Sequence, residues 1–211
     1  RCGFIDERGE RVRAVLVTGL IADYRLGEVP GATILYDLRS SRAVVEAIER
    51  AGGRAVRSRV GHAFIKARMR EEGALFAGEL SGHYYYRDMG FTDNGLVTMV
   101  MVANILAASG KTLSALMKPL DRYPTTGEIN LRASDPERVF TALAARYRDA
   151  DLDHLDGLTV GYPAWWFNIR SSHTEPVVRL NLEADTEGLM HEKAREVLGV
   201  IREADPGARE V

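Results

Sequence analysis

The sequence predicts an α/β protein in two parts: a mixed α/β/α layer domain, followed by a small α+β domain with a helix-covered antiparallel sheet. Three observations support this prediction. In the first half, short β-rich runs alternate with helical patterns of about ten residues, which is typical of layered α/β domains. The alternation stops in the segment 119–124, which contains two prolines. Beyond it, several strand signals are flanked by two helical patterns, which indicates helices packed on one face of a sheet.

The first half begins with a predicted short strand at 2–5 that runs into a turn, and a short helix is predicted at 111–116. Asp93 is well placed to cap the last long helix of this half. The predicted strands lie at 32–36, 54–57, 74–77 and 84–86, and the predicted helices lie at 12–24, 41–51, 62–72 and 94–108.

In the second half, Ser134 is the expected cap of a helix that has Pro136 in its first turn. The predicted strands lie at 126–131, 157–162, 165–169 and 177–184, and the predicted helices lie at 135–148 and 187–203. We place the domain boundaries at 1–10, 11–120 and 121–211.

Composition limits the classes of partner. The 28 basic and 30 acidic side chains give a net charge of -2 without a basic stripe, so we expect no nucleic-acid partner. The longest uncharged stretch, 94–110, is too short to span a bilayer, and we expect no membrane association. A single cysteine, Cys2, excludes an internal disulfide and favours a reducing, cytoplasmic location. Any anion-binding site must therefore be formed by particular residues rather than by an overall positive field.

The segment 170–176 lies between two strand signals and contains Arg170 and three hydroxyl side chains. A guanidinium fork together with hydroxyl and backbone N–H donors suits a phosphate dianion. Each charge-assisted hydrogen bond of this kind contributes about 1.5–3 kcal/mol. Taken alone, a stretch of this composition is more often an ordinary hairpin loop.

The segment 78–83 is a second candidate, because Glu79 is flanked by glycines at the end of a strand. The carboxylate of Glu79 and the hydroxyl of Ser81 can bind neighbouring hydroxyl groups of a sugar. His83 can stabilise or protonate a group near a transferring phosphate. The alternative is a glycine-rich turn with an exposed glutamate.

Both segments resemble motifs of the α-D-phosphohexomutases. Segments 166–176 and 179–184 resemble the signature of the family's last domain, and 78–83 resembles the Gly-Glu-Met-Ser-Gly-His loop of its third domain, with Leu80 in place of Met. The resemblance covers essentially the whole chain and about half of the family's four-domain length. It implies that Glu79 and Ser81 bind the 3- and 4-hydroxyls of the sugar, and that His83 is catalytic. It also implies that the phosphate that is not transferred is bound by Arg170, Ser171, Ser172, His173 and Thr174.

Two further substrate-binding residues follow from the same resemblance. His62, in Gly61-His62, matches a Gly-His motif whose histidine faces the phosphosugar, although a histidine at a helix start is more often a surface or capping residue. Arg39 stands where relatives often have an active-site lysine. His173 occupies a position where the family more often has asparagine.

The resemblance implies an isomerase of carbohydrate metabolism. Members of the family interconvert hexose 1-phosphate and hexose 6-phosphate through a phosphoserine enzyme and a bisphosphate intermediate, with Mg²⁺ held by an Asp-x-Asp-x-Asp loop. Arg1 matches the last residue of that loop, so we expect 1–10 to be a remnant of the metal-binding domain. The phosphoserine and all metal ligands are then expected outside this chain, in a missing N-terminal half that would be its partner.

On this interpretation, the 211-residue chain binds a phosphorylated hexose but is inactive alone. One alternative is a non-catalytic phosphosugar-binding module, which the same site residues fit. Another is a generic α/β domain without a ligand site, which requires both motif matches to be chance.

Overall fold

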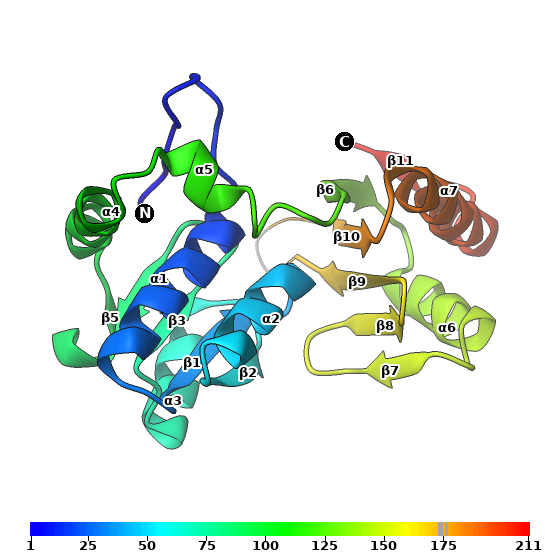
Figure 1. Cartoon of the computed structure of the whole chain (residues 1–211). Helices are drawn as coiled ribbons and strands as arrows, with labels where there is room; N and C mark the ends of the chain where they lie inside the picture. Colours follow the sequence, from blue (N-terminus) through cyan, green and yellow to red (C-terminus); the bar gives the residue numbers. More distant parts are fainter. Residues whose placement is uncertain (173–174, 176) are drawn as a thin grey trace. The chain divides into compact units, whose positions relative to one another are not determined.

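The computed structural model describes residues 1–172, 175 and 177–211 and divides the chain into two compact units (Figure 1). The first unit is Arg1–Arg122 and the second is Tyr123–Val211. Separate clusters of buried apolar side chains form the cores of the two units. No helix among the described residues is long and apolar enough to cross a membrane.

The first unit contains a five-stranded sheet in the order β2-β1-β3-β4-β5. The central strand β1 (Thr33–Asp37) is buried along its whole length and pairs in parallel with β2 (Arg54–Ser58) and β3 (Phe76–Gly78). Two short antiparallel strands, β4 (Tyr84–Tyr86) and β5 (Thr92–Asp93), extend the sheet. Because β1, β2 and β3 are parallel, their carboxyl ends meet at one edge of the sheet.

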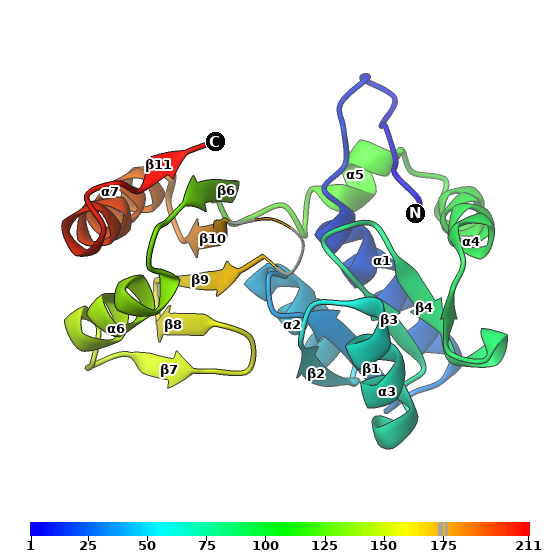
Figure 2. The same ribbon diagram turned by 180° about the vertical axis from the view of Figure 1, so that it is seen from behind.

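Helices cover both faces of this sheet, as the α/β/α prediction requires (Figures 1 and 2). Ile34 of β1 packs into the cluster formed with α1 and α2, while the next residue, Leu35, packs against α3 on the opposite face. This alternation follows from the pleat of a strand, which points successive side chains to opposite faces. The helices are α1 (Ala14–Glu28), α2 (Arg42–Arg50), α3 (His62–Glu72), α4 (Gly95–Ser109) and α5 (Leu113–Met117), with a short 3-10 helix at Arg87–Met89.

The second unit is a six-stranded antiparallel sheet in the order β11-β6-β10-β9-β8-β7. Alternate residues of its central strands, such as Phe167 and Leu180, pack against both helices of the unit. The α+β prediction is therefore confirmed. The strands are β6 (Thr125–Arg132), β7 (Asp151–Asp153), β8 (Leu158–Tyr162), β9 (Trp165–Ser171), β10 (Val178–Ala184) and β11 (Arg209–Glu210), and the helices are α6 (Pro136–Arg146) and α7 (Glu187–Ala204).

Two predicted helix caps were wrong by one residue. Asn94, not Asp93, caps α4 by accepting hydrogen bonds from two backbone N–H groups, because Asp93 belongs to β5 and pairs with Tyr85. Asp135, not Ser134, caps α6, because both the backbone N–H and the hydroxyl of Ser134 donate to Asp205 instead.

The polar edge strands β7 and β11 were not predicted, and the predicted strand at 2–5 is a single bridge between Ile5 and Arg11. Charged side chains dominate β7 and β11, so neither has the apolar alternation that reveals a strand. In the N-terminal segment, the backbone N–H of Cys2 donates to the carbonyl of Gly82, 2.9 Å away. This contact braces the loop that contains Glu79.

Candidate functional site

The carboxyl edge of the first unit's sheet gathers the residues predicted to read the sugar. Open α/β sheets bind ligands at this edge. Glu79 follows β3 directly, and His62 begins α3 shortly after β2. The chain then returns through His83 into β4, so His83 lies at the same edge. Two segments that are distant in sequence, Gly61–His62 and Glu79–His83, thus meet in one place.

Glu79 is the most firmly held of these residues, with 2% of its surface exposed. The hydroxyl of Tyr85 donates to Oε2 at 2.8 Å, and the backbone N–H of Gly61 donates to Oε1 at 3.2 Å. Burying a carboxylate is unfavourable unless such donors compensate it. Burial, followed by the charge of Glu79, raises the pKa of Tyr85, so the phenol remains a donor. Tyr85 was not predicted as a site residue.

Ser81 and His83 lie against the same carboxylate. The Ser81 hydroxyl is 3.2 Å from Oε2 of Glu79 and 2.9 Å from Nδ1 of His83. His83 Nδ1 is itself 3.3 Å from Oε2. Burial, and then the charge of His62, lowers the pKa of His83. The imidazole is therefore neutral at pH 7 and able to accept or pass on a proton.

His62 is more exposed and contacts both His83 and an unpredicted carboxylate. The ring centroids of His62 and His83 are 4.2 Å apart. Asp93 Oδ1 lies 3.6 Å from His62 Nδ1 and 3.6 Å from Lys66 Nζ. Burial alone would raise the pKa of Asp93, but a backbone hydrogen bond and the neighbouring cationic groups lower it.

Arg39 is joined to this edge through Asp37. Asp37 is fully buried at the end of β1, and its Oδ2 accepts from Arg39 Nη2 at 2.7 Å and from the backbone N–H of Leu80 at 2.8 Å. One carboxylate thus positions both Arg39 and the loop that contains Glu79. Asp37 was missed in the sequence, although an acidic residue at the carboxyl end of a buried strand is a recognisable signal.

Arg170 lies in the second unit, and the structure corrects its predicted place in a loop. Strand β9 continues through Ser171, so Arg170 is a strand residue, 3% exposed and directly opposite Arg179 of β10. The Glu128 carboxylate lies 3.6 Å from Arg170 Nη2 and 3.5 Å from Arg179 Nη1. Like charges opposite one another on a ladder repel. Glu128 offsets this repulsion and was not predicted.

The remaining predicted phosphate-binding residues are not all brought to Arg170. The Ser171 side chain lines a pocket of about 550 Å³ with Phe140 and Ala144 of α6, on the face opposite Arg170. The backbone N–H of Ser172 donates to the carbonyl of Val177 at 2.8 Å. His173 and Thr174 lie outside the described residues.

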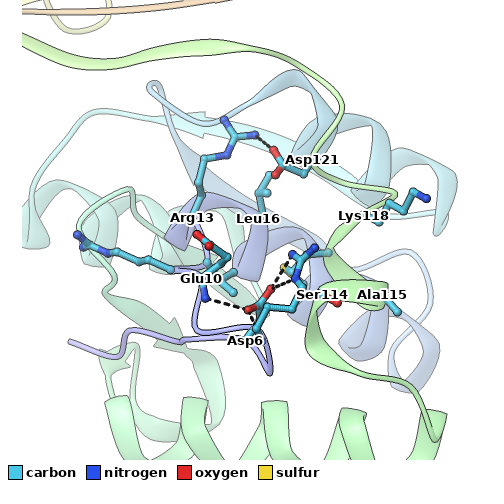
Figure 3. A pocket seen from close by; sticks show the side chains of 12 residues that line it. Asp6, Glu10, Arg13, Leu16, Ser114, Ala115, Lys118 and Asp121 are labelled. Carbon is cyan, nitrogen blue, oxygen red and sulfur yellow. Dashed lines mark hydrogen bonds and ion pairs between the residues drawn. The ribbon is translucent and has the colours of Figure 1, made fainter.

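A separate pocket of about 690 Å³ in the first unit contains none of the predicted site residues (Figure 3). It lies between the N-terminal turn, the start of α1 and α5. Asp6 pairs with Arg8, and Arg13 pairs with Asp121 at 2.6 Å, so charged groups lining the pocket pair with one another. We assign no ligand to it.

Among the described residues, one group has the donor atoms and spacing for a metal ion: His62, Glu79 and His83, whose ligand atoms all lie within 4.8 Å of one another. Mg²⁺ prefers octahedral oxygen ligands, chiefly carboxylates and water. Two imidazoles and one carboxylate do not fit that preference, so no step is assigned to Mg²⁺ at these residues.

Comparison with known proteins finds a family match for each of the two units. Residues 16–123 match the family model "Phosphoglucomutase/phosphomannomutase, alpha/beta/alpha domain III", and residues 128–200 match the model of the C-terminal domain of the same family. The phosphomannomutase of Methanocaldococcus jannaschii is 42% identical over 205 residues, which is 97% of this chain and 46% of that protein. The phosphomannomutase of Escherichia coli is 38% identical over 207 residues, 96% of this chain and 45% of that protein.

A crystal structure of a phosphoglucomutase/phosphomannomutase family protein from Burkholderia thailandensis has the same fold. It superimposes with a TM-score of 0.87 at 31% identity and covers 99% of this chain and 45% of that one. The chain thus spans about half the length of the relatives it matches. The agreement extends through both units, and the chain belongs to the phosphoglucomutase/phosphomannomutase family, matching its third and C-terminal domains.

Proposed function

We propose that this chain is the sugar- and phosphate-binding half of an enzyme that interconverts hexose 1-phosphate and hexose 6-phosphate. The observation that carries the proposal is the convergence of Glu79, Ser81, His62 and His83 at one sheet edge, where open α/β sheets bind ligands. Two relatives that match nearly the whole chain are phosphomannomutases.

Glu79 and Ser81 bind the sugar in this proposal. A carboxylate accepts from a sugar hydroxyl in a charge-assisted hydrogen bond, and an adjacent serine hydroxyl serves the neighbouring position. Tyr85 and Gly61 hold Glu79 so that little side-chain entropy is lost on binding. Glucose and mannose differ at carbon 2, so a site that reads hydroxyls 3 and 4 accepts both.

Arg170 binds the phosphate that is not transferred, together with Ser172, His173 and Thr174, whereas the Ser171 side chain lies on the opposite face of β9. Its planar fork of donors matches two phosphate oxygens at once. Arg39, which Asp37 holds in the first unit, is a further substrate-binding residue of that unit. His83, neutral at pH 7 by virtue of its lowered pKa, is the catalytic residue that passes a proton near the transferring group.

Phosphoryl transfer also needs a phosphoserine and Mg²⁺, which we place in an N-terminal half of the same enzyme. Mg²⁺ supplies neutralisation of the charge that develops on the transferring group. The 211-residue chain alone is expected to bind hexose phosphates without turning them over.

The substitution Glu79→Gln tests the sugar site. We expect calorimetric titration to show binding of both glucose 1-phosphate and mannose 1-phosphate, with affinity for each about tenfold lower in the variant. The reason is the loss of a charge-assisted hydrogen bond of about 1.5 kcal/mol. Gln keeps the shape of the side chain, so a thermal melt should show a folded protein.

The exposed Glu192→Gln on α7 is the matched control and should bind like the parent chain. Unchanged affinity in Glu79→Gln, or inorganic phosphate binding as tightly as the hexose phosphates, would contradict the proposed role of Glu79. Binding without turnover, even after the N-terminal half is added, would instead favour the non-catalytic phosphosugar-binding module.

A further inference from the structure

We propose that His62, Glu79 and His83 form a binding site for a divalent transition-metal ion such as Zn²⁺, and that binding of this ion and binding of the sugar are mutually exclusive. The first part rests on the geometry of the three side chains alone. The second part rests on the proposed function, because it requires that Glu79 also binds the sugar.

The spacing of the ligand atoms suits a tetrahedral ion. With zinc–ligand bonds of about 2.0–2.1 Å, neighbouring ligands of a tetrahedral site lie about 3.4 Å apart. Oε2 of Glu79 and Nδ1 of His83 are 3.3 Å apart. The ligand atom of His62 completes a group within 4.8 Å. Two ligands thus already have the required separation, and the third needs a shift of one side chain.

His62 can make that shift because 45% of its side chain is exposed at the start of α3. Glu79 is held by donors from Tyr85 and Gly61, and Nδ1 of His83 would exchange its contact with the Ser81 hydroxyl for the ion. The solvent-facing side chain of His62 gives an ion a path of entry from water.

The donor set selects the class of ion. Two imidazoles and one carboxylate are a ligand set characteristic of catalytic zinc sites, in which the fourth position is left to water. Carboxylate oxygens and water suit Mg²⁺ better, whereas imidazole favours Zn²⁺, Ni²⁺ and Cu²⁺. The site therefore discriminates against the ion that the family's phosphoryl transfer requires.

Groups around the three ligands provide the support that metal sites need. Tyr85 and the backbone N–H of Gly61 donate to the Glu79 carboxylate, which orients it. Asp93 lies 3.6 Å from His62 Nδ1, an arrangement that leaves the other ring nitrogen for the ion. Lys66 Nζ lies 3.6 Å from Asp93 Oδ1, and its positive charge opposes binding of a cation nearby.

An ion at this site would occupy the Glu79 carboxylate, which the sugar needs as its hydrogen-bond acceptor. A carboxylate oxygen that bound Zn²⁺ would be a weaker hydrogen-bond acceptor for a sugar hydroxyl. The predicted consequence is inhibition of sugar binding by Zn²⁺.

The test uses the 211-residue chain without a histidine tag, titrated with Zn²⁺ by calorimetry and with Co²⁺ by visible absorption. We expect one ion per chain in the micromolar range and intense absorption typical of tetrahedral Co²⁺. His62→Ala and Glu79→Gln should each weaken binding at least tenfold. His191→Ala, at an exposed histidine on α7, is the matched control and should bind like the parent. Absence of binding at micromolar Zn²⁺, or binding unchanged in both variants, would overturn the site.

A second arm tests the exclusion. Zn²⁺ is titrated with mannose 1-phosphate present, and with the same concentration of inorganic phosphate as the control for chelation in solution. We expect the sugar phosphate to lower the apparent Zn²⁺ affinity beyond the phosphate control, and an equal affinity would refute mutual exclusion. If Zn²⁺ binds but no hexose phosphate does, the proposed function fails and the ion site stands. If the hexose phosphates bind but Zn²⁺ does not, only the ion site fails.

Discussion

Replacing Arg170 with alanine is expected to weaken binding of mannose 1-phosphate and glucose 1-phosphate at least about 100-fold. The guanidinium makes two charge-assisted hydrogen bonds to phosphate in the proposed complex, each contributing about 1.5 kcal/mol, and 3 kcal/mol corresponds to roughly 100-fold in affinity. Arg170 is 3% exposed in β9, so its guanidinium is held in place by the surrounding sheet. Calorimetric titration measures the change.

Two further variants make the Arg170 result specific. Arg170→Lys keeps the charge but loses the planar fork, so its affinity should fall between those of the parent and Arg170→Ala. Arg202→Ala, at a half-exposed arginine on α7, should bind like the parent. A folded Arg170→Ala chain with parental affinity for both ligands would show that the phosphate is bound elsewhere.

Gly157→Ala is expected to destabilise the second unit by about 2–5 kcal/mol. Gly157 precedes β8 with a φ of +75°, where an L-residue costs about 1–2 kcal/mol. A Cβ at this position would lie 2.2 Å from the carbonyl oxygen of Ile169 and 2.7 Å from Cα of Arg170, so the backbone of β9 must move. Overpacking of this kind adds about 1–3 kcal/mol.

The displaced backbone is that of Arg170 itself, so Gly157→Ala should also weaken hexose phosphate binding under conditions where the variant is folded. Urea unfolding measures the stability, and titration below the transition measures the affinity. Gly188→Ala is the control, because Gly188 lies in α7 with no atom within 4 Å of the added Cβ. Parental stability in Gly157→Ala would mean that β8 and β9 approach each other less closely than described.

The layered fold was predictable because its helices and its buried strands each have a local signal. Buried parallel strands are short apolar runs, and β1 is one of them. Strands without that signal were missed, since β7 and β11 are short and polar. Local patterns also place a cap only to within a residue. Whether Asp93 caps α4 or pairs in β5 is decided by its register with Tyr85, which is a tertiary contact.

The candidate site was predictable only in part, for the same reason. Glu79, Ser81 and His83 lie in a glycine-flanked loop that is visible in the sequence, whereas Asp37 and Tyr85 look like ordinary strand residues until the sheet brings them to Glu79. A charged residue after an apolar run indicates a loop. Arg170 departs from that pattern, because it lies within β9. Its charge there is offset by Glu128 on another strand, a partner that no local pattern reveals.

Binding of the hexose phosphate to these residues is best tested by titrating the 211-residue chain with mannose 1-phosphate and following each residue in the amide NMR spectrum. We expect saturable shifts at Gly61, His62 and Glu79–His83 in the first unit, and at Arg170–Ser172 in the second. Saturable shifts confined to other segments, such as the pocket around Asp6 and Arg13, would contradict the proposed binding, and so would an unchanged spectrum at millimolar ligand.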